Sequence, residues 1–97
     1  MPSSAAFLSP EQTAQALPYA ALAREIEALL QDASVAVPPR IVQPLQGGGS
    51  LFVMPAADAQ VAITKLISFI PGNAQRGLPT IQGDIVVFDV QTGQRVA

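Results

Sequence analysis

The sequence contains no cysteine and no histidine, and these two absences remove several kinds of chemistry at once. Without cysteine there is no disulfide and no thiol nucleophile, and without either residue the common zinc sites lose their ligands. Imidazole acid–base catalysis is excluded as well. No nucleophile is paired with a base, and no Gly-x-Gly-x-x-Gly fingerprint for a dinucleotide is present. We therefore expect no metal site and no catalytic residue in this chain.

Charge is also scarce, since five basic and seven acidic residues make up 12% of the chain. The basic residues stand singly, which argues against a nucleic-acid partner. The longest unbroken apolar run, Tyr19–Ala23, is far shorter than the roughly 20 residues that cross a bilayer. No basic segment precedes an apolar core at the N-terminus, so a signal peptide is not indicated. We expect a cytoplasmic protein with no nucleic-acid or membrane partner.

What the sequence has in excess is apolar side chains. A chain of 97 residues is at most one small domain, yet 49% of it is hydrophobic. The interior of such a small domain cannot bury this many apolar side chains. Some of them are therefore expected to face a partner subunit or another domain. A well-packed monomer is the alternative.

The first third of the sequence predicts two helices. Ser9 as N-cap, Pro10 at the first helical position and Gln12 at the capping-box position mark the start of the first. It should end near Leu17, because Pro18 disfavours helical geometry in the residue before it. A second helix is expected from Pro18 to Asp32, with one apolar stripe for covering a sheet; its members are Tyr19, Leu22, Ile26, Leu29 and Leu30. A short strand is expected at Phe7–Leu8.

The rest of the sequence predicts strands. They are expected at Arg40–Leu45, Ser50–Met54, Val61–Ile70 and Thr80–Val90, with turns at Gly47–Gly49 and Asp89–Gly93 and a loop at Pro71–Pro79. The triple glycine is not followed by a helix start and a Lys-Ser/Thr pair, so a hairpin is favoured over a phosphate loop. The alternation makes both sheet faces apolar, and two helices can cover only one. We predict an α+β fold: two N-terminal helices packed on a mainly antiparallel sheet, which pairs with a second copy in a dimeric, barrel-like arrangement.

Two cations are the main candidates for a binding site. Lys65 lies inside an apolar strand, where an ammonium is costly to bury unless an anion pairs with it. Arg40 follows two prolines that stiffen the approach, and its guanidinium matches a carboxylate. Together they could clamp an α-carboxylate. The alternatives are a solvated surface arginine and a lysine that extends to the sheet edge.

Other polar residues are weaker candidates. Thr80 offers a hydroxyl directly after the loop. Asn73 is expected to brace the loop rather than to contact substrate. Asp84 and Asp89 are five residues apart in one strand, so they should point to opposite faces and cannot act as a carboxylate pair.

Three separated blocks resemble the N-terminal region of the ornithine cyclodeaminase/mu-crystallin family. They are PPRIVQPLQGGGSLFVMPA, KLISFIPGN and GLPTIQGDIVVFDVQTGQRVA, and the likeness runs from Leu8 onward. The resemblance implies an α/β substrate-binding and dimerisation domain whose sheets join across a dimer, beside a Rossmann domain. It matches Arg40 and Lys65 to contacts with the substrate carboxylate, and Thr80 to a position near the cofactor. Gln82 lies near where relatives vary and could bear on substrate choice.

The same resemblance implies an NAD-dependent reaction. In ornithine cyclodeaminase, NAD takes a hydride from the amino acid, the side-chain amine closes a ring, ammonia leaves and the hydride returns to give proline. Relatives reduce cyclic imines, oxidise alanine or bind ligands. This chain ends before the family's Arg-Thr-Ala-Ala helix, its nucleotide fingerprint and the acidic residue assigned to proton transfer.

Residues 1–97 are therefore expected to be part of a substrate-binding and dimerisation domain, without the Rossmann domain. We expect this part to be inactive alone and to form a homodimer. An amino acid such as ornithine is the expected substrate, and NAD is expected to act in the full-length enzyme. The alternatives are a non-catalytic binding or dimerisation module, or the corresponding part of a ketimine reductase or alanine dehydrogenase.

Overall fold

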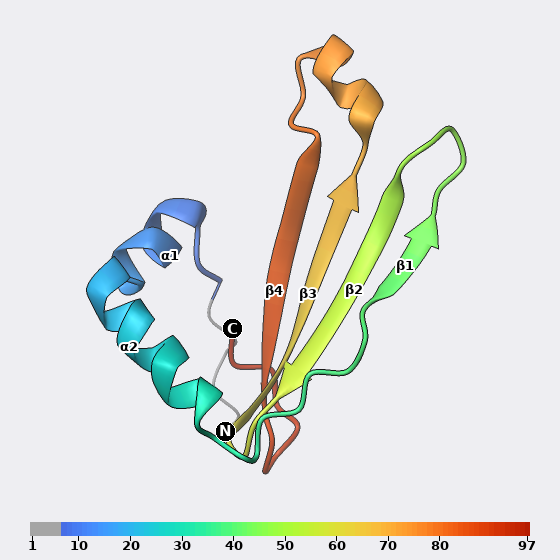
Figure 1. Cartoon of the computed structure of the whole chain (residues 1–97). Helices are drawn as coiled ribbons and strands as arrows, with labels where there is room; N and C mark the ends of the chain where they lie inside the picture. The colour runs from blue at the N-terminus through green and yellow to red at the C-terminus, as the bar shows by residue number, and fades with distance from the viewer. Residues whose placement is uncertain (1–6) are drawn as a thin grey trace.

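The computed structural model describes residues 7–97 (Figure 1). Its elements are α1 (Pro10–Ala16), α2 (Tyr19–Leu30), β1 (Ile41–Pro44), β2 (Ser50–Ala57), β3 (Val61–Phe69), the 3-10 helix η1 (Pro71–Arg76) and β4 (Ile81–Asp89). The strands form one sheet in the order β1-β2-β3-β4, and every neighbouring pair is antiparallel. The α+β fold with an antiparallel sheet is confirmed. Across residues 7–97, the helices are all too short or too polar to cross a bilayer.

The start of α1 follows the predicted capping box. The Ser9 hydroxyl accepts a hydrogen bond from the Gln12 backbone at 3.1 Å, and the Gln12 side chain accepts one from the Ser9 backbone at 2.9 Å. The helix ends at Ala16, and Pro18 occupies the N-cap position of α2 without a side-chain capping bond. The predicted strand at Phe7–Leu8 is wrong, because these residues lie outside any strand and Phe7 is 82% exposed.

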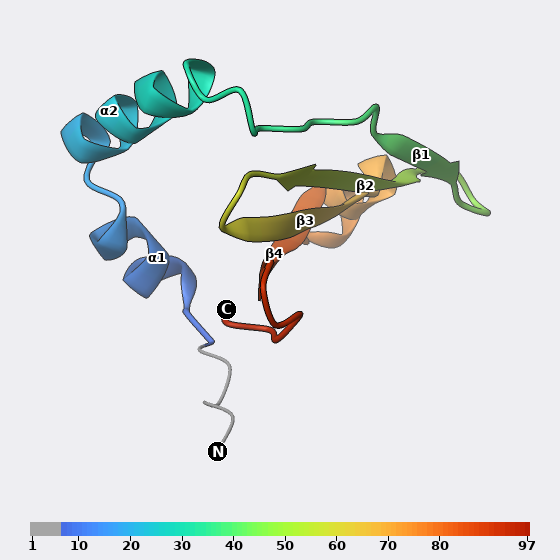
Figure 2. The same ribbon diagram turned by 90° about the horizontal axis from the view of Figure 1, so that it is seen from below.

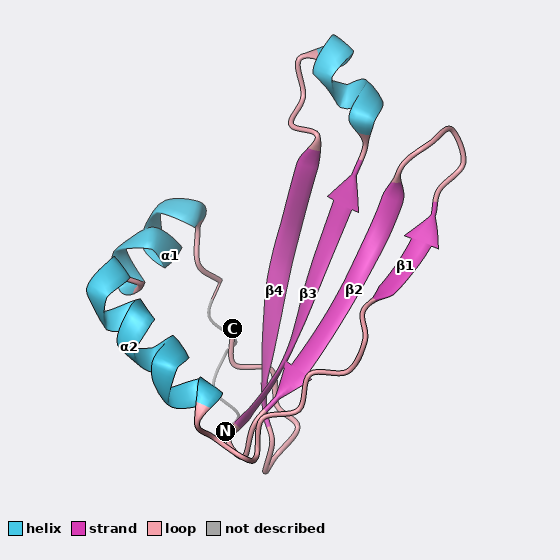
Figure 3. Ribbon diagram, viewed as in Figure 1, coloured by secondary structure: helices cyan, strands magenta, loops and turns pink. Residues whose placement is uncertain are grey.

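The expected packing of the helices on the sheet is not present in the single chain. Within residues 7–97, neither α1 nor α2 contacts a strand, and both helices stand to one side of the sheet (Figures 2 and 3). The segment between α2 and β1 is anchored to the sheet through Ala36, which bridges Ala57 of β2. The apolar stripe of α2 is left open to solvent, with Tyr19 90% and Leu30 80% exposed.

The hairpin between β1 and β2 is confirmed. Gly47, Gly48 and Gly49 have φ values of 86°, 88° and 137°, a range that only glycine adopts without strain. They lead into a strand, as a hairpin requires and a phosphate loop does not.

Strand β2 runs further than predicted, through Pro55 to Ala57. The backbone N–H of Ala57 faces Ala36, so the Pro55 nitrogen, two residues earlier, faces the same side. Pairing with β1 ends at Val53, so no strand there requires a hydrogen bond from Pro55. This position tolerates proline as a sheet edge does.

Both ends of β4 carry ordered turns. The predicted loop at Pro71–Pro79 contains the 3-10 helix η1, which sequence patterns did not indicate. After β4, the Asp89 carboxylate accepts hydrogen bonds from the backbone of Gln91 at 2.7 Å and Thr92 at 3.1 Å. The turn lies where it was predicted, and it brings the chain back along β4, where Arg95 bridges Phe88.

The described chain has no apolar core of its own. None of the apolar side chains in residues 7–97 is buried. The chain exposes 7650 Å², whereas a compact protein of this mass would expose about 5,300 Å². Its radius of gyration is 15.8 Å, against about 12.5 Å for a compact domain of this length. The expected surplus of apolar surface is present.

Candidate functional site

Arg40 and Lys65 lie on the same face of the sheet. Met54 of β2 pairs with Lys65 of β3. On the other side of β2, Ile41 pairs with Val53, so continuing this register by one residue places Arg40 opposite Met54. Residues directly opposite one another in antiparallel strands share a face. Two strand spacings of about 4.8 Å place the Cα atoms of Arg40 and Lys65 about 10 Å apart. Both side chains are long enough to reach a small molecule above Met54.

A shallow hollow of about 340 Å³ opens beside this row. It is lined by Arg40, Phe52, Met54, Ile67, Phe69 and Ile81. We call it the Arg40 hollow. Apart from the guanidinium, its lining side chains are apolar, and Lys65 lies next to it, between Met54 and Ile85 in the register. The arrangement offers two positive charges at the rim of an apolar floor.

The floor of the hollow orients Arg40. Its guanidinium carbon lies 5.3 Å from the centre of the Phe52 ring, a cation–π distance. Contact with a ring face leaves the N–H edge of a guanidinium free for a carboxylate.

Lys65 lies in an apolar strand, as the sequence indicates, but it is not buried in the single chain. Its neighbours are apolar, but Lys65 and Arg40 are both exposed, because the face that carries them has no cover within residues 7–97. The ammonium therefore carries no burial cost here. A cover over this face would remove water and strengthen the attraction of both cations for an anion.

The structure does not bring the remaining candidates to the Arg40 hollow. Thr80 precedes β4 and lies opposite Ile70, where its carbonyl accepts a hydrogen bond from the Ile70 backbone at 2.8 Å. Gln82 pairs with Ser68 and therefore lies on the other face. Neither residue lines the hollow.

The two aspartates of β4 lie on opposite faces, as predicted. Asp84 pairs with Leu66, and Asp89 pairs with Val61 on the face that carries Lys65. Asp89 is four residues along the sheet from the row of Lys65, roughly 13 Å away. A carboxylate pair is thereby excluded.

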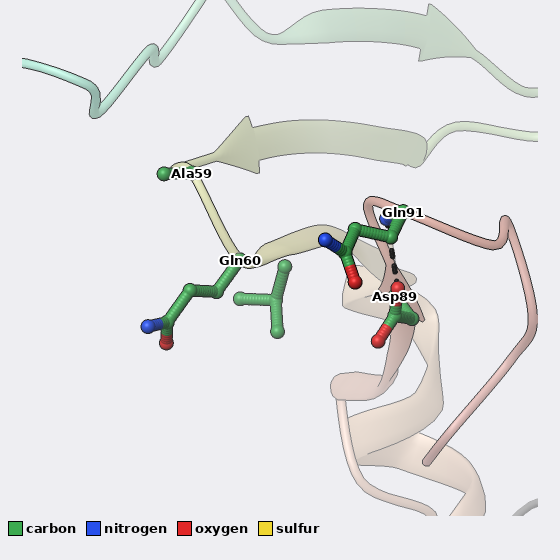
Figure 4. Close-up of a pocket in the computed structure, with 5 residues that line it drawn as sticks. Ala59, Gln60, Asp89 and Gln91 are labelled. Carbon is green, nitrogen blue, oxygen red and sulfur yellow. Dashed lines mark hydrogen bonds between the residues drawn. The ribbon is translucent and has the colours of Figure 1, made fainter.

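A larger hollow of about 460 Å³ lies at the opposite end of the sheet (Figure 4). Its lining is Ala59, Gln60, Val61, Asp89 and Gln91. The Asp89 carboxylate points into the turn that follows β4. It accepts a hydrogen bond from the backbone N–H of Gln91, which is drawn as a dashed line in Figure 4. With its acidic group engaged in a turn, this hollow is a weaker candidate than the Arg40 hollow.

Asp58 has a shifted pKa, but it serves the β2–β3 turn. Hydrogen bonds from the backbone of Val61 at 2.9 Å and Gln60 at 2.7 Å hold the pKa of this carboxyl below its ordinary value of 3.8. The carboxylate therefore stabilises the turn.

Sequence reasoning missed the floor of the hollow. Phe52 and Met54 were assigned to a strand but not to a site. The signal was available, because strict alternation places them on one face, and the glycine hairpin folds Arg40 back beside them.

Residues 4–97 match the family model described as the ornithine cyclodeaminase/mu-crystallin family. The chain belongs to this family. It is 41% identical over 85 residues to a Δ1-pyrroline-2-carboxylate reductase of Burkholderia multivorans. The aligned region covers 84% of this chain and 27% of the relative. It is 40% identical over 86 residues to a second such reductase, from Burkholderia ambifaria, covering 86% of this chain and 28% of the relative.

A third family member and a solved structure extend this comparison. A Δ1-pyrroline-2-carboxylate/Δ1-piperideine-2-carboxylate reductase of Azospirillum brasilense is 39% identical over 85 residues, 84% of this chain and 27% of the relative. An archaeal alanine dehydrogenase dimer with bound NAD matches with a TM-score of 0.62 and 29% identity, over 74% of this chain and 21% of that chain. This ornithine cyclodeaminase/mu-crystallin family chain thus spans about a quarter of the length of the curated relatives it matches.

Proposed function

We propose that this chain is the substrate-carboxylate-binding and dimerisation part of an NAD(P)-dependent reductase that acts on a cyclic imino acid such as Δ1-pyrroline-2-carboxylate. The observation that carries the proposal is the placement of Arg40 and Lys65 on one sheet face, on either side of Met54, at an apolar hollow.

The two cations divide the recognition of a carboxylate between them. The planar guanidinium of Arg40 donates two parallel hydrogen bonds to the two carboxylate oxygens, and contact with Phe52 sets its plane. The ammonium of Lys65 adds a second positive charge from the neighbouring strand. The ring of the ligand then lies on the apolar floor formed by residues such as Met54 and Ile67.

The environment of the hollow favours a cyclic imine over ornithine. Ornithine carries a second ammonium on its side chain, which requires an acidic partner when it leaves water. The strand register places Asp89 on the same sheet face as Lys65, but roughly 13 Å from the row that contains Lys65, which is too far to pair with the second ammonium of ornithine. The reductase relatives support the same choice, so the lyase reaction expected from the resemblance is not the one we propose.

NAD(P) is assigned to the whole enzyme and not to this chain. Among residues 7–97, the glycine-rich turn at Gly47–Gly49 leads into β2, whereas a dinucleotide pyrophosphate needs a glycine turn that opens a helix. These residues do not fit the cofactor, and Thr80 remains a predicted neighbour of it. The NAD bound to the archaeal alanine dehydrogenase supports cofactor use by the longer protein.

A second copy of the chain is the proposed cover for the open apolar surface. The exposed area exceeds that of a compact protein of the same mass by about 2,300 Å². Obligate dimers bury about 2,000–5,000 Å² in total, so the surplus is large enough for such an interface. The dimeric state of the alanine dehydrogenase supports this choice. Sedimentation of the protein as a monomer would contradict it.

The substrate assignment is tested with the protein at its natural length. Reduction of Δ1-pyrroline-2-carboxylate with NADH and NADPH is compared with cyclisation of ornithine and oxidation of alanine. We expect the imine to be the preferred substrate, and Lys65→Met to raise its KM with the fold intact. Arg24→Met removes a cation from exposed α2 and should leave KM unchanged.

Three results would contradict the proposal. Preferred turnover of ornithine would restore the lyase reaction, and an unchanged KM for Lys65→Met would show that the lysine is structural. A dimer with no affinity for any carboxylate would favour a non-catalytic dimerisation module.

A further inference from the structure

Asn73 is the one buried residue between residues 7 and 97, with 6% of its surface exposed. It lies in η1, within the loop that joins β3 to β4. Its side-chain amide is used at both ends: Nδ2 donates to the Pro79 carbonyl at 3.0 Å, and Oδ1 accepts from the Arg76 guanidinium at 3.1 Å. A polar side chain buried with both ends bonded is a brace within an otherwise open molecule.

The backbone of Asn73 is bonded across the same loop. Its N–H donates to the Ile70 carbonyl at 3.1 Å, and its carbonyl accepts from the Leu78 N–H at 3.0 Å. Asn73 therefore ties the start of the loop, next to β3, to the end of the loop, next to β4. The expectation that it braces the loop is confirmed.

The strand ends held by this brace form one wall of the Arg40 hollow. Phe69, the last residue of β3, pairs with Ile81, the first residue of β4, and both line the hollow. Asn73 does not line the hollow itself. Any effect of Asn73 on a bound molecule must therefore act through Phe69 and Ile81.

We propose that Asn73 is a positioning residue, which holds in place the wall formed by Phe69 and Ile81. Through this wall, Asn73 determines which carboxylate ligands bind, according to the group that carries the carboxylate. The proposal rests on the proposed function, because it takes the Arg40 hollow as the ligand site. Arg40 and Lys65 bind the carboxylate, which every candidate ligand shares. The wall contacts the part of the ligand that differs between candidates, so its position governs selectivity.

The test uses Asn73→Asp in the protein at its natural length. Aspartate has nearly the same shape and keeps an oxygen toward Arg76, but it replaces the Nδ2 donor with an acceptor facing the Pro79 carbonyl. The probes are acetate, which presents a carboxylate with one methyl group, and cyclopentanecarboxylate, which adds a ring. Gln75→Ala, an exposed position in η1, is the matched control, and dissociation constants are measured by NMR titration.

We expect Asn73→Asp to weaken binding of cyclopentanecarboxylate by about tenfold, the effect of one lost buried hydrogen bond, and to leave acetate unchanged. Gln75→Ala should change neither constant. Arg76→Ala removes only the bond to Oδ1 and should weaken the ring ligand by about threefold. It also serves as the second variant if Asn73→Asp does not fold.

The outcomes separate this inference from the function on which it rests. Equal weakening of both probes by the Asn73 and Arg76 variants would overturn the selective role, since a loosened fold acts on both ligands alike. Unchanged ring affinity in both variants, while Arg40→Met weakens both probes, would overturn the role of Asn73 and leave the carboxylate site standing. If Arg40→Met weakens neither probe, the proposed function fails first.

Discussion

The guanidinium carbon of Arg40 lies 5.3 Å from the centre of the Phe52 ring. Arg40 directly precedes β1 and Phe52 lies in β2, so the glycine hairpin between these strands brings the pair together. Because this contact sets the plane of the guanidinium, Phe52 is proposed to contribute to carboxylate binding without contacting the carboxylate itself.

Phe52→Leu tests this orientation of Arg40. Leucine keeps the floor apolar but removes the cation–π contact, so we expect carboxylate binding to weaken by about two- to fivefold, equivalent to about 0.5–1 kcal/mol. Isothermal titration with the preferred substrate measures it. Phe88→Leu, on the other face of β4, is the control and should have no effect. An equal loss in both variants would show that Phe52 contributes only to folding.

Arg40→Lys tests whether carboxylate binding needs the planar guanidinium of Arg40 or only its positive charge. Lysine keeps the positive charge but cannot donate two parallel hydrogen bonds to one carboxylate, so affinity should fall by about tenfold. The same titration gives the result, and Arg24→Lys on α2 provides the reference. Full affinity in Arg40→Lys would mean that the guanidinium geometry is not used.

Gly83→Ala should destabilise the pairing of β3 with β4. A Cβ at this position would meet the Leu66 carbonyl oxygen at 2.6 Å and Ile67 Cγ1 at 3.0 Å, so the strands must shift. We expect a loss of about 1–3 kcal/mol in the free energy of unfolding, as for other overpacked sites. Chemical denaturation measures it, with Gly72→Ala as control, since a Cβ at Gly72 meets nothing within 4 Å. Equal stability of the two variants would contradict this prediction.

Asp58 is expected to make the stability of the β2–β3 turn depend on pH in the acid range. Its pKa in the folded protein is lowered by hydrogen bonds from the Val61 and Gln60 backbones, so the unfolded chain binds this proton more readily. Its contribution to stability is present above the ordinary pKa of 3.8 and is lost as pH falls through the lower folded value.

The measurement compares unfolding of the parent and Asp58→Asn from neutral pH to below pH 3. The parent should lose more stability than Asp58→Asn over the acid range. Asp84→Asn removes the same charge in mid-strand and controls for net charge. Parallel curves for the parent and Asp58→Asn would contradict the assignment.

The features that sequence predicted well are those that neighbouring residues determine. Ser9 and Gln12 form their capping box within one turn, and alternation gave the extent of β3 and the opposite faces of Asp84 and Asp89. The common face of Arg40 and Lys65 follows from the same alternation once the hairpin register is known. A site built on adjacent strands is therefore largely readable from sequence.

The errors concern features set by distant parts of the structure. Proline normally ends a strand, and Pro55 is tolerated only because β1 has already ended beside it. In η1 the Asn73 N–H makes a local bond to Ile70, but its side-chain bond to the Pro79 carbonyl forms only when the loop between β3 and β4 closes. The packing of α2 depends on surfaces that its own periodicity does not identify.

The proposed dimer would link two processes that are separate in most small proteins. In that dimer the large hydrophobic side chains leave water only on association, so folding and assembly are expected to occur as one transition. The midpoint of thermal unfolding should then rise with protein concentration. Substitutions of Tyr19 or Leu30, harmless on an ordinary solvent-facing helix, would instead shift the balance between folded assembly and unfolded chain.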